Sequence, residues 1–366
     1  MESIKSISIK GFKSISNLKD FELRPMNVLI GPNAAGKSNL LSFFNLLNWS
    51  FKSNPQLQLY VQTKGGANSI LFDGANTTTE IVGQFVFEQP ASNFEYLMQL
   101  DYASPDRLVY SQEKYRIITE SRKSSGWIHF GAGHLESKLC EIDTTDDRDA
   151  RLILKALRKM SMYQFHNTSF TSRMRQRWPR YDNNLLKEDG ANIAPFLFKM
   201  KNKYPDYYNK IINTIRMIYP DFDEFVFDES RNILLQWREQ GSDYIFASHQ
   251  ASDGTLRMFA LVTLLSQPIQ MLPNLLVIDE PELGLHPYAI NIIGGLMKSV
   301  SVHKQILIAT QSGAFADQFE VDDIIIVDKI DRTSIFSRKT KAELVNWLDK
   351  YSLSELWNAN IIGGRP

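Results

Sequence analysis

The chain has 366 residues, and its 41 Lys and Arg are balanced by 41 Asp and Glu. This length allows one large domain or two ordinary ones, and the 43% hydrophobic composition argues against wholesale disorder. The single cysteine, Cys140, excludes an internal disulfide and fits a reducing cytoplasm. No apolar run approaches the roughly 20 residues that cross a membrane. Zero net charge gives no overall argument for a nucleic acid partner.

The first third of the chain is predicted to consist mainly of strands around one helix. Residues 7–15 largely alternate apolar and polar side chains like a half-buried strand, and a second strand covers 26–30. Helical spacing of the apolar residues begins at Lys37. Turn-rich pieces then separate three strands, which indicates an antiparallel meander over 80–87, 96–102 and 107–118.

The rest of the chain is predicted to be helical in its middle and to alternate helices with buried strands at its end. Helices are expected over 151–162, 193–201 and 207–218, followed by strands over 224–227 and 233–237. A helix over 252–265, a strand over 275–278, a helix over 287–300 and strands over 305–310 and 323–327 complete the set. Such apolar strands are typical of a sheet covered on both faces, so we predict one α/β domain split by a helical insertion.

The strongest motif lies between the second predicted strand and the first predicted helix. Residues 31–38 read Gly-Pro-Asn-Ala-Ala-Gly-Lys-Ser, a phosphate loop with two glycines, four residues between them, and then Lys and Ser. Backbone N–H groups and a helix N-terminus form a concavity for anions. Lys37 is expected to reach the β- and γ-phosphates, and the Ser38 hydroxyl to help hold Mg²⁺. The residues expected to line bound ATP are Gly31, Pro32, Asn33, Ala34, Ala35, Gly36, Lys37, Ser38 and Asn39.

A buried strand at 275–278 is followed by two carboxylates, Asp279 and Glu280. Ligands bind at the carboxyl edge of a parallel sheet, where these side chains should lie. We expect Asp279 to meet Mg²⁺, directly or through water, and Glu280 to orient or deprotonate the water that attacks the γ-phosphate. An acidic strand end is a weak signal alone, but the phosphate loop makes a purely structural role unconvincing.

A third motif, Ser252-Asp253-Gly254-Thr255, precedes a predicted amphipathic helix and lies shortly before the acidic strand end. Ser and Gly at a helix start are good phosphate ligands and equally good N-cap residues. The tetrapeptide alone therefore leaves both interpretations open.

These motifs, taken together, are similar to those of a known family. They comprise 9–15 (Ile-Lys-Gly-Phe-Lys-Ser-Ile), 31–38, 252–257 (Ser-Asp-Gly-Thr-Leu-Arg), 278–287 (Ile-Asp-Glu-Pro-Glu-Leu-Gly-Leu-His-Pro), 309–312 (Ala-Thr-Gln-Ser) and 354–357 (Ser-Glu-Leu-Trp). The chain resembles ABC-type ATPases of the RecF and structural-maintenance-of-chromosomes (SMC) group, and more closely small AAA-family ATPases of the overcoming-lysogenization-defect (OLD) type. The resemblance implies a P-loop NTPase fold of the ABC-ATPase type, with a mixed sheet, an antiparallel β lobe and a helical insertion.

The resemblance also implies that two such heads enclose ATP between them. Ser252 and Gly254 would then be a signature motif that contacts, in trans, the γ-phosphate bound by the opposite subunit. Residues 284–287 would form a loop that crosses the dimer interface. The sequence agrees with this implication, because the Lys37 site has no evident internal partner that would close it.

The resemblance implies two further residues of the nucleotide site, although the motifs around them are less specific. Gln311 stands where transporter ATPases carry a switch histidine and is expected to sense the γ-phosphate. Gln164, at the entrance to the insertion, is the candidate for the glutamine loop. The nearby His166 has no Cys or His at a metal-ligand spacing and is interpreted as a hydrogen-bonded loop histidine.

Four arginines are grouped in the middle of the chain around Trp178, without an intervening acid. Arginines beside an aromatic residue suit contact with phosphates and bases. The alternatives are a solvated loop, a docking surface for an acidic partner, or, for Arg173 or Arg175, contact with ATP. The candidate nucleic acid or partner surface comprises Arg173, Arg175, Arg177 and Arg180.

The sequence supports a definite division of the chain and three classes of function. We expect a first ATPase lobe over 1–125, a mainly helical insertion over 126–240, a second ATPase lobe over 241–340 and a tail over 341–366.

The first hypothesis is an ATP-gated homodimer, or higher homo-oligomer, that engages DNA in repair or antiphage defence. The second is a switch that controls a separately encoded effector, such as a Toprim-type nuclease, without touching DNA. A transporter subunit fits least well, because the opening strand, the signature and the insertion differ from the transporter pattern.

Any nuclease is expected on another chain. The 39 residues from 328 to 366 are too few for a Toprim domain of about 100 residues. We therefore expect an ATPase that uses ATP and Mg²⁺, has no membrane partner, and delivers a conformational output.

Overall fold

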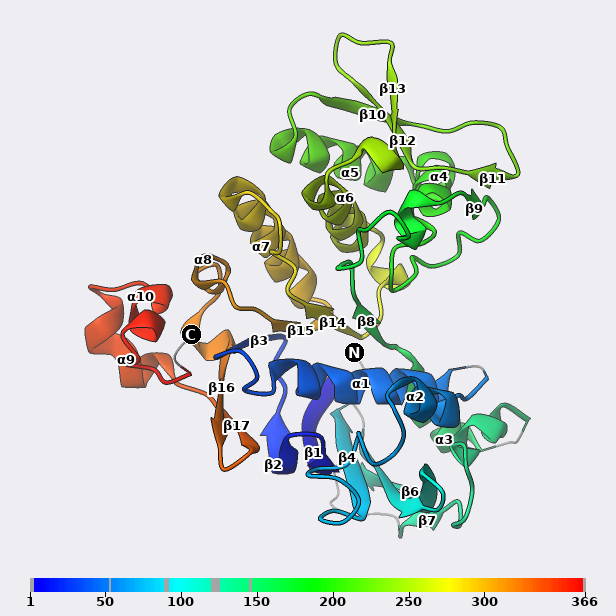
Figure 1. The fold of residues 1–366 in the computed structure, drawn as a ribbon, viewed down its shortest axis with the longest axis vertical. Coiled ribbons are helices and arrows are strands. Elements are labelled where there is room, and N and C mark those ends of the chain that lie inside the picture. Colours follow the sequence, from blue (N-terminus) through cyan, green and yellow to red (C-terminus); the bar gives the residue numbers. More distant parts are fainter. Residues whose placement is uncertain (1–2, 53, 89–91, 120–125, 145–146, 365–366) are drawn as a thin grey trace.

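The computed structural model describes residues 3–52, 54–88, 92–119, 126–144 and 147–364, and it is built around two six-stranded sheets (Figure 1). The first is antiparallel, with the order β2-β1-β4-β5-β6-β7. Its strands are β1 (Ser3–Phe12), β2 (Ile15–Glu22), β4 (Glu80–Glu88), β5 (Ser92–Ala103), β6 (Arg107–Thr119) and β7 (Ile128–His129). The predicted meander is therefore confirmed, and it pairs with the opening strand.

The second sheet carries the acidic strand end and has the order β17-β16-β3-β15-β14-β8. All its strands are parallel except β17, so the loops that follow them leave from the same edge. Its strands are β3 (Met26–Ile30), β8 (Met160–Tyr163), β14 (Leu275–Asp279), β15 (Gln305–Ala309), β16 (Ile324–Ile330) and β17 (Thr333–Ser337). Strands β3 and β15 are buried along their whole length, as their mainly apolar sequences predict. The amide side chains of Asn27 in β3 and Gln305 in β15 are buried with hydrogen bonds to Ile306 O and Ile4 O.

Helix α1 (Lys37–Phe51) lies between the two sheets and joins their cores. Phe43 stacks on Phe85 of β4 with ring centroids 6.0 Å apart, and Val277 of β14 belongs to the same buried cluster. A helix buried on nearly every side needs apolar residues all round, which explains the run from Leu40 to Leu47. The short helices α2 (Leu57–Thr63) and α3 (Arg148–Arg158) pack beside it.

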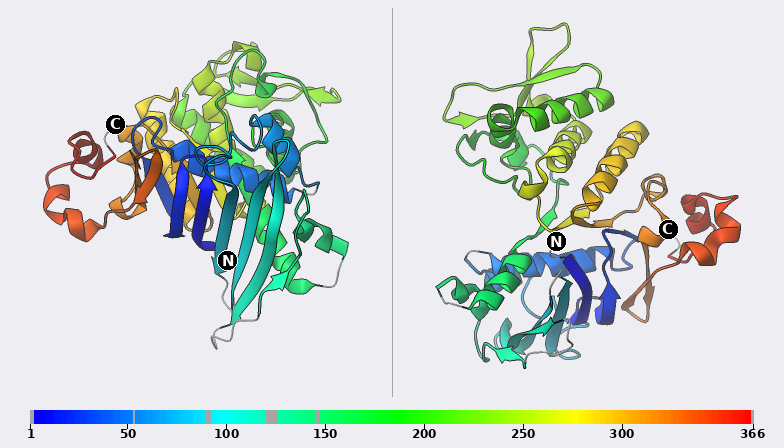
Figure 2. Two further views of the ribbon diagram at one scale, coloured as in Figure 1. Left: turned by 60° about the horizontal axis from the view of Figure 1, so that its bottom comes forward. Right: turned by 180° about the vertical axis from the view of Figure 1, so that it is seen from behind.

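The opposite face of the second sheet is covered by a helical lobe (Figure 2). Its helices are α4 (Ile193–Lys203), α5 (Pro205–Ile218), α6 (Asp253–Ser266) and α7 (Pro287–Ser301). Short strands decorate it, namely β9 (Trp178–Pro179), β10 (Phe222–Val226), β11 (Asn232–Ile233), β12 (Gln236–Glu239) and β13 (Ile245–Ala247). The chain ends with α8 (Gly313–Ala316), α9 (Lys341–Leu348) and α10 (Leu353–Asn358), and no helix among the described residues is long and apolar enough to span a membrane.

Three elements differ from the sequence prediction. The strand expected over 7–15 is interrupted by a turn, because β1 ends at Phe12 and β2 begins at Ile15. The helix expected over 151–162 ends at Arg158, because the carbonyl of Lys159 accepts from the backbone N–H of Asn274 and the next residues pair with β14 as strand β8. The strand expected over 233–237 is two strands, β11 and β12. Pairing with a segment more than 100 residues away overrode local helical periodicity in β8.

The boundary expected at residue 126 also differs from the arrangement in space. Strand β7 pairs with β6 of the antiparallel sheet, and β8 lies at the edge of the second sheet. Most of the residues from 126 to 163 therefore pack with the first lobe, and the insertion proper follows β8.

A buried carboxylate holds the antiparallel sheet to the segment that follows it. Glu113 of β6 has no exposed surface, and its oxygens pair with Tyr96 Oη at 2.8 Å and His134 Nε2 at 2.9 Å. They also accept from Ser137 Oγ and from the backbone N–H of Lys138. One side chain thus satisfies four polar groups that would otherwise be buried without partners.

We expect Glu113→Leu to lower the free energy of unfolding by about 3–5 kcal/mol, because it leaves these groups buried and unpaired. Glu88→Leu is the control, since Glu88 is 55% exposed and 4.0 Å from Lys5; it should cost less than about 0.5 kcal/mol. Denaturant unfolding measures both. Equal costs for the two variants would show that the Glu113 cluster does not stabilise the fold.

Candidate active site

The phosphate-loop motif forms a tight turn between β3 and α1, as predicted. Gly31, Ala34 and Gly36 have positive φ angles of 149°, 64° and 112°. A Cβ on Gly31 would lie 2.1 Å from the carbonyl oxygen of Val327, and one on Gly36 would lie 1.9 Å from Ser334 Oγ. Both glycines are therefore required by conformation and by close approach, independently of any ligand.

Lys37 points back into this loop from the first turn of α1. Its Nζ donates to the carbonyl oxygens of Gly31, at 2.5 Å, and Pro32, at 3.0 Å, and the residue is 6% exposed. Burial lowers the pKa of Lys37, whereas the nearby carboxylates of Glu280 and Asp279 oppose that shift. The ammonium group is thus held within the loop, close to the acidic strand end.

Asp279 and Glu280 lie at the common carboxyl edge of the parallel strands, next to the phosphate loop. Burial raises the pKa of Asp279, and His166, Lys37 and a hydrogen bond from the Ser38 hydroxyl oppose this rise. Ser38 and Asp279, which the sequence assigned to Mg²⁺, are therefore brought together. An oxygen pair of this kind suits Mg²⁺, which binds through one or two carboxylates, water and substrate phosphates.

Glu280 and Gln311 are in direct contact. Strand β15 lies between β3 and β14, so the residues that follow it, Thr310 and Gln311, emerge between the phosphate loop and the acidic strand end. The Gln311 side-chain amide donates to a carboxylate oxygen of Glu280. Glu280 has a φ of 40°, unusual for a residue other than glycine, and its backbone N–H donates to Ala309 O at 2.8 Å. Strained backbone of this kind clusters at active sites.

Glu282 is a site residue that the sequence analysis missed. It is 9% exposed, and its Oε1 accepts from Thr310 Oγ1 at 2.6 Å and from the Gln311 backbone N–H at 3.3 Å. Its Oε2 is buried without a hydrogen-bond partner in the part of the chain that the structure describes. Burial raises the pKa of Glu282, opposed by the bond from Thr310. Glu282 therefore holds in place the segment that presents Gln311 to Glu280.

The signature motif opens helix α6 as expected. Ser252 Oγ accepts from the backbone N–H of Thr255 at 3.1 Å, so Ser252 is an N-cap, and it is also exposed. A Cβ on Gly254 would lie 2.3 Å from the carbonyl oxygen of Gly284. The signature thus touches the start of the 284–287 loop that was predicted to cross a dimer interface.

Arg257, one turn into α6, connects three segments of the site. Its guanidinium donates to Leu283 O at 2.9 Å, His166 O at 3.0 Å and Phe165 O at 3.2 Å. The signature helix, the loop after β14 and the segment after β8 are therefore held in one arrangement.

His166, at the entrance to the insertion, contacts the acidic strand end. His166 Nε2 lies 2.7 Å from the carbonyl oxygen of Asp279. Gln164 makes its backbone hydrogen bond to Glu188 O, and together with His166 it lines a cavity of about 1100 Å³ between α1 and the insertion. The interpretation of His166 as a hydrogen-bonded loop residue is confirmed, and Gln164 stays a prediction for the glutamine loop.

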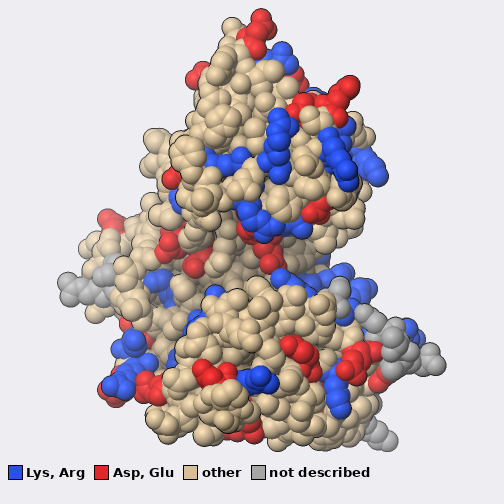
Figure 3. Space-filling model, turned by 45° about the vertical axis from the view of Figure 1, so that its right-hand side comes forward, with Lys and Arg blue, Asp and Glu red and all other residues tan. Residues whose placement is uncertain are grey.

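The four clustered arginines are engaged within the chain. Arg173 pairs with Asp189 at 2.8 Å, and Arg177 pairs with Asp228 at 3.1 Å. Arg180 donates to the carbonyl oxygen of Asp228, and Arg175 reaches the segment before α6. Figure 3 shows basic and acidic side chains interspersed on this face of the helical lobe. The cluster seemed to lack acidic partners because those partners are distant in sequence.

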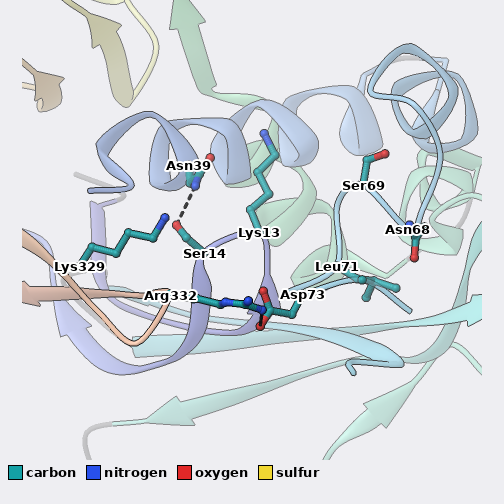
Figure 4. A pocket seen from close by; sticks show the side chains of 10 residues that line it. Lys13, Ser14, Asn39, Asn68, Ser69, Leu71, Asp73, Lys329 and Arg332 are labelled. Carbon is teal, nitrogen blue, oxygen red and sulfur yellow. Dashed lines mark hydrogen bonds and ion pairs between the residues drawn. The ribbon is translucent and has the colours of Figure 1, made fainter. Parts of the chain in front are cut away.

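A polar pocket of about 820 Å³ lies beside the phosphate loop (Figure 4). Ser14 Oγ accepts from Asn39 Nδ2 at 2.6 Å and lies 2.6 Å from Ser334 Oγ, which in turn donates to Ala35 O. The pocket therefore shares a wall with the loop. Its charged lining consists of Lys13, Lys329 and Arg332 against Asp73. Burial, followed by the charge of Lys64, lowers the pKa of Lys13. An excess of cations beside a phosphate loop favours an anionic ligand.

The chain matches one known family and is similar in fold to solved structures. A family model described as "AAA domain, putative AbiEii toxin, Type IV TA system" matches residues 26–317. No curated protein sequence matches the chain. Among solved structures, an Smc head bound to the C-terminal winged-helix domain of ScpA is similar with a TM-score of 0.61 at 13% identity, covering 93% of this chain and 99% of that one.

A second solved structure gives the same result. An Smc head with an extended coiled coil, bound to the C-terminal domain of ScpA and derived from Pyrococcus furiosus, has a TM-score of 0.60 at 13% identity. The similarity covers 96% of this chain and 99% of that one. At this level of identity the likeness shows the fold, which is the SMC-head type of P-loop NTPase.

Proposed function

The chain belongs to the AAA domain family described as a putative AbiEii toxin of a type IV toxin–antitoxin system, and from this premise we propose that it binds and hydrolyses ATP. The observation that carries the proposal is the convergence of Lys37, Ser38, Asp279, Glu280 and Gln311 at one edge of the parallel sheet. Each of these residues has a chemical part in phosphoryl transfer to water.

The phosphates bind in the loop between β3 and α1. Backbone N–H groups of the loop and the ammonium group of Lys37 neutralise phosphate charge. Ser38 and Asp279 would hold Mg²⁺, which would supply further neutralisation of the phosphate charge. Glu280 orients the attacking water and takes up its proton, and Gln311 holds the Glu280 carboxylate in position.

The base and sugar of the nucleotide extend from the loop into the pocket beside it, whose excess of Lys and Arg suits the negative charge of the nucleotide as a whole. The pocket's volume of about 820 Å³ falls within the range of small-molecule sites. Lys13, fixed by its hydrogen bond to Ser42 Oγ at 2.8 Å, lies on the side of the pocket formed by α1 (Figure 4). This assignment is supported by the wall of serines and Asn39 that the pocket shares with the phosphate loop.

Two copies of the chain enclose ATP, each supplying Ser252 and Gly254 to the nucleotide held by the other. The support is that Ser252 is exposed beside the 284–287 loop, so that a second copy can reach it. ATP binding closes this dimer and hydrolysis opens it, and the opening and closing are the output of the molecule.

That output acts on a separate effector protein. The two similar Smc heads were each solved with a domain of another protein, ScpA. The engagement of Arg173, Arg175, Arg177 and Arg180 within the chain removes the main sequence argument for direct DNA contact. We therefore favour an ATP-dependent switch over a head that grips DNA itself, with antiphage defence or DNA repair as its setting and a nuclease as one class of effector.

Lys37→Ala tests the ATP site directly. We expect ATP to bind about 10- to 100-fold more weakly, because a charge-assisted hydrogen bond contributes about 1.5–3 kcal/mol. Calorimetric titration measures this loss. Chelation of divalent ions should abolish hydrolysis by the unaltered chain.

Lys298→Ala is the control, since Lys298 is exposed on α7, and it should leave ATP binding unchanged. Equal affinity of the Lys37→Ala and unaltered chains for ATP would contradict the proposed site. So would hydrolysis that continues without divalent ions.

A further inference from the structure

Arg175 belongs to the insertion but makes most of its contacts with the segment that leads into the signature motif. Its Nη1 donates to the carbonyl oxygens of Ser248, at 2.5 Å, and Ala251, at 3.1 Å. Its Nη2 lies 3.1 Å from a carboxylate oxygen of Asp253, inside the signature itself. In return, Ser248 Oγ donates to the backbone carbonyl of Arg175 at 3.0 Å.

The Arg175 side chain differs from the neighbouring arginines in being buried. The Arg175 side chain is 9% exposed, whereas those of Arg173 and Arg177 are 52% and 51% exposed. Exposed ion pairs contribute little to stability, but a buried guanidinium must have its donors satisfied. Arg175 meets this need with four acceptors, the fourth being Thr168 O at 2.8 Å.

These contacts determine where the signature lies. Residues 248–251 run directly into Ser252, so the two carbonyl oxygens that Arg175 holds fix the backbone just before the exposed cap. On the other side, the signature is fixed by the contact of Gly254 with Gly284. Ser252 is thus placed between two restraints, one from the insertion and one from the loop after β14.

We propose that Arg175 is a positioning residue that ties the insertion to the signature and so presents Ser252 and Gly254 to the ATP held by a second copy of the chain. The inference rests on the proposed composite site and deepens it by naming the insertion as the part that sets the trans contact. A planar fork with several donors is needed here, because a lysine ammonium cannot span two carbonyls and a carboxylate in the same geometry.

The consequence is a defect that must appear in the neighbouring subunit's site. Loss of Arg175 displaces the signature that a subunit offers to its partner, while the subunit's own phosphate loop, Lys37 and Glu280 stay intact. A residue that only stabilised its own subunit's fold or its own ATP site would behave differently, because an intact partner would not repair it.

The experiment compares Arg175→Met and Arg175→Lys with Arg177→Met as the matched control from the same loop. Arg175→Met should lower steady-state ATP hydrolysis on the order of 10²-fold, the size of loss that misplacement by about 1 Å produces. Its affinity for ATP as a monomer should be unchanged. Arg175→Lys should recover little of the activity, and Arg177→Met should keep nearly all of it.

The decisive measurement mixes Arg175→Met subunits with Lys37→Ala subunits, each inactive alone. In a mixed dimer, the phosphate loop of the Arg175→Met chain faces the intact signature of the Lys37→Ala chain. Random mixing should restore about a quarter of normal turnover, since half of the dimers contain one complete site out of two. If the Arg175→Met chain does not fold, the same mixing experiment is done with Arg175→Lys in its place.

Failure of the mixture identifies which idea is wrong. If the reference mixture of Lys37→Ala with Ser252→Arg recovers activity but the Arg175 mixture does not, Arg175 acts on its own subunit and the inference is overturned. If the reference mixture also fails, the composite site itself is wrong, and the inference falls with it. Weaker ATP binding by the Arg175→Met monomer would also overturn the inference.

Discussion

Replacing Glu280 with glutamine is expected to slow ATP hydrolysis on the order of 10³-fold, the range of a general base, while ATP still binds. Glutamine has the shape of glutamate but cannot take up a proton from the attacking water. It retains a carbonyl oxygen for the hydrogen bond from Gln311, so the geometry at the end of β14 should persist. Phosphate release measures the loss of hydrolysis, and a separate titration with ATP measures whether binding is retained.

The same substitution should trap a dimer. If closure requires ATP and opening requires hydrolysis, the Glu280→Gln chain with ATP and Mg²⁺ should double in mass by light scattering, and should remain monomeric with ADP. Glu229→Gln, an exposed substitution on the helical lobe, is the control and should hydrolyse ATP normally. Unchanged turnover would remove Glu280 from its role, and slow turnover without a dimer would argue against ATP as the closing ligand.

The predicted site residues that the structure brings together belong to motifs of neighbouring residues. The phosphate loop needs glycine where φ is positive and where Val327 and Ser334 approach the backbone, and these requirements fall within eight consecutive residues. The ends of β14 and β15 are similar, because an apolar strand followed by polar residues predicts an active edge in a parallel sheet. Local pattern was therefore enough to point to Lys37 and Asp279, whereas Gln311 was singled out only by the family resemblance.

The parts that the sequence did not reveal depend on contacts between distant segments. The acceptors that define the role of Arg175 lie up to 78 residues away, and no pattern along the chain relates them. Strand β8 was taken for the end of a helix because its partner, β14, is more than 100 residues away. The Glu-Pro-Glu sequence at 280–282 was visible, but only the fold shows that the second carboxylate turns inward to hold Thr310.

The composite nature of the site leads to the second large effect, recovery of activity on mixing two inactive chains. Lys37→Ala removes the cation that the loop needs for phosphate, but leaves α6 and its signature intact. Ser252→Arg leaves the phosphate loop intact, but places a long side chain at the exposed N-cap of α6 and so blocks the one site to which that signature contributes. Each chain alone should lose hydrolysis by about 10²-fold or more, by the loss of phosphate positioning.

In the mixed dimer, the intact loop of the Ser252→Arg chain meets the intact signature of the Lys37→Ala chain. Turnover should rise to about a quarter of normal when half of the dimers carry one complete site. Ser252→Ala is the matched control for bulk: it removes the cap at a cost of about 1 kcal/mol of helix stability, without blocking the approach of a second copy, so its loss of activity should be smaller. If both parent chains are folded and their mixture stays inactive at every ratio, the signature does not act in trans. Ser252 is then a helix cap and nothing more, which is the role that its hydrogen bond to Thr255 already gives it within one chain.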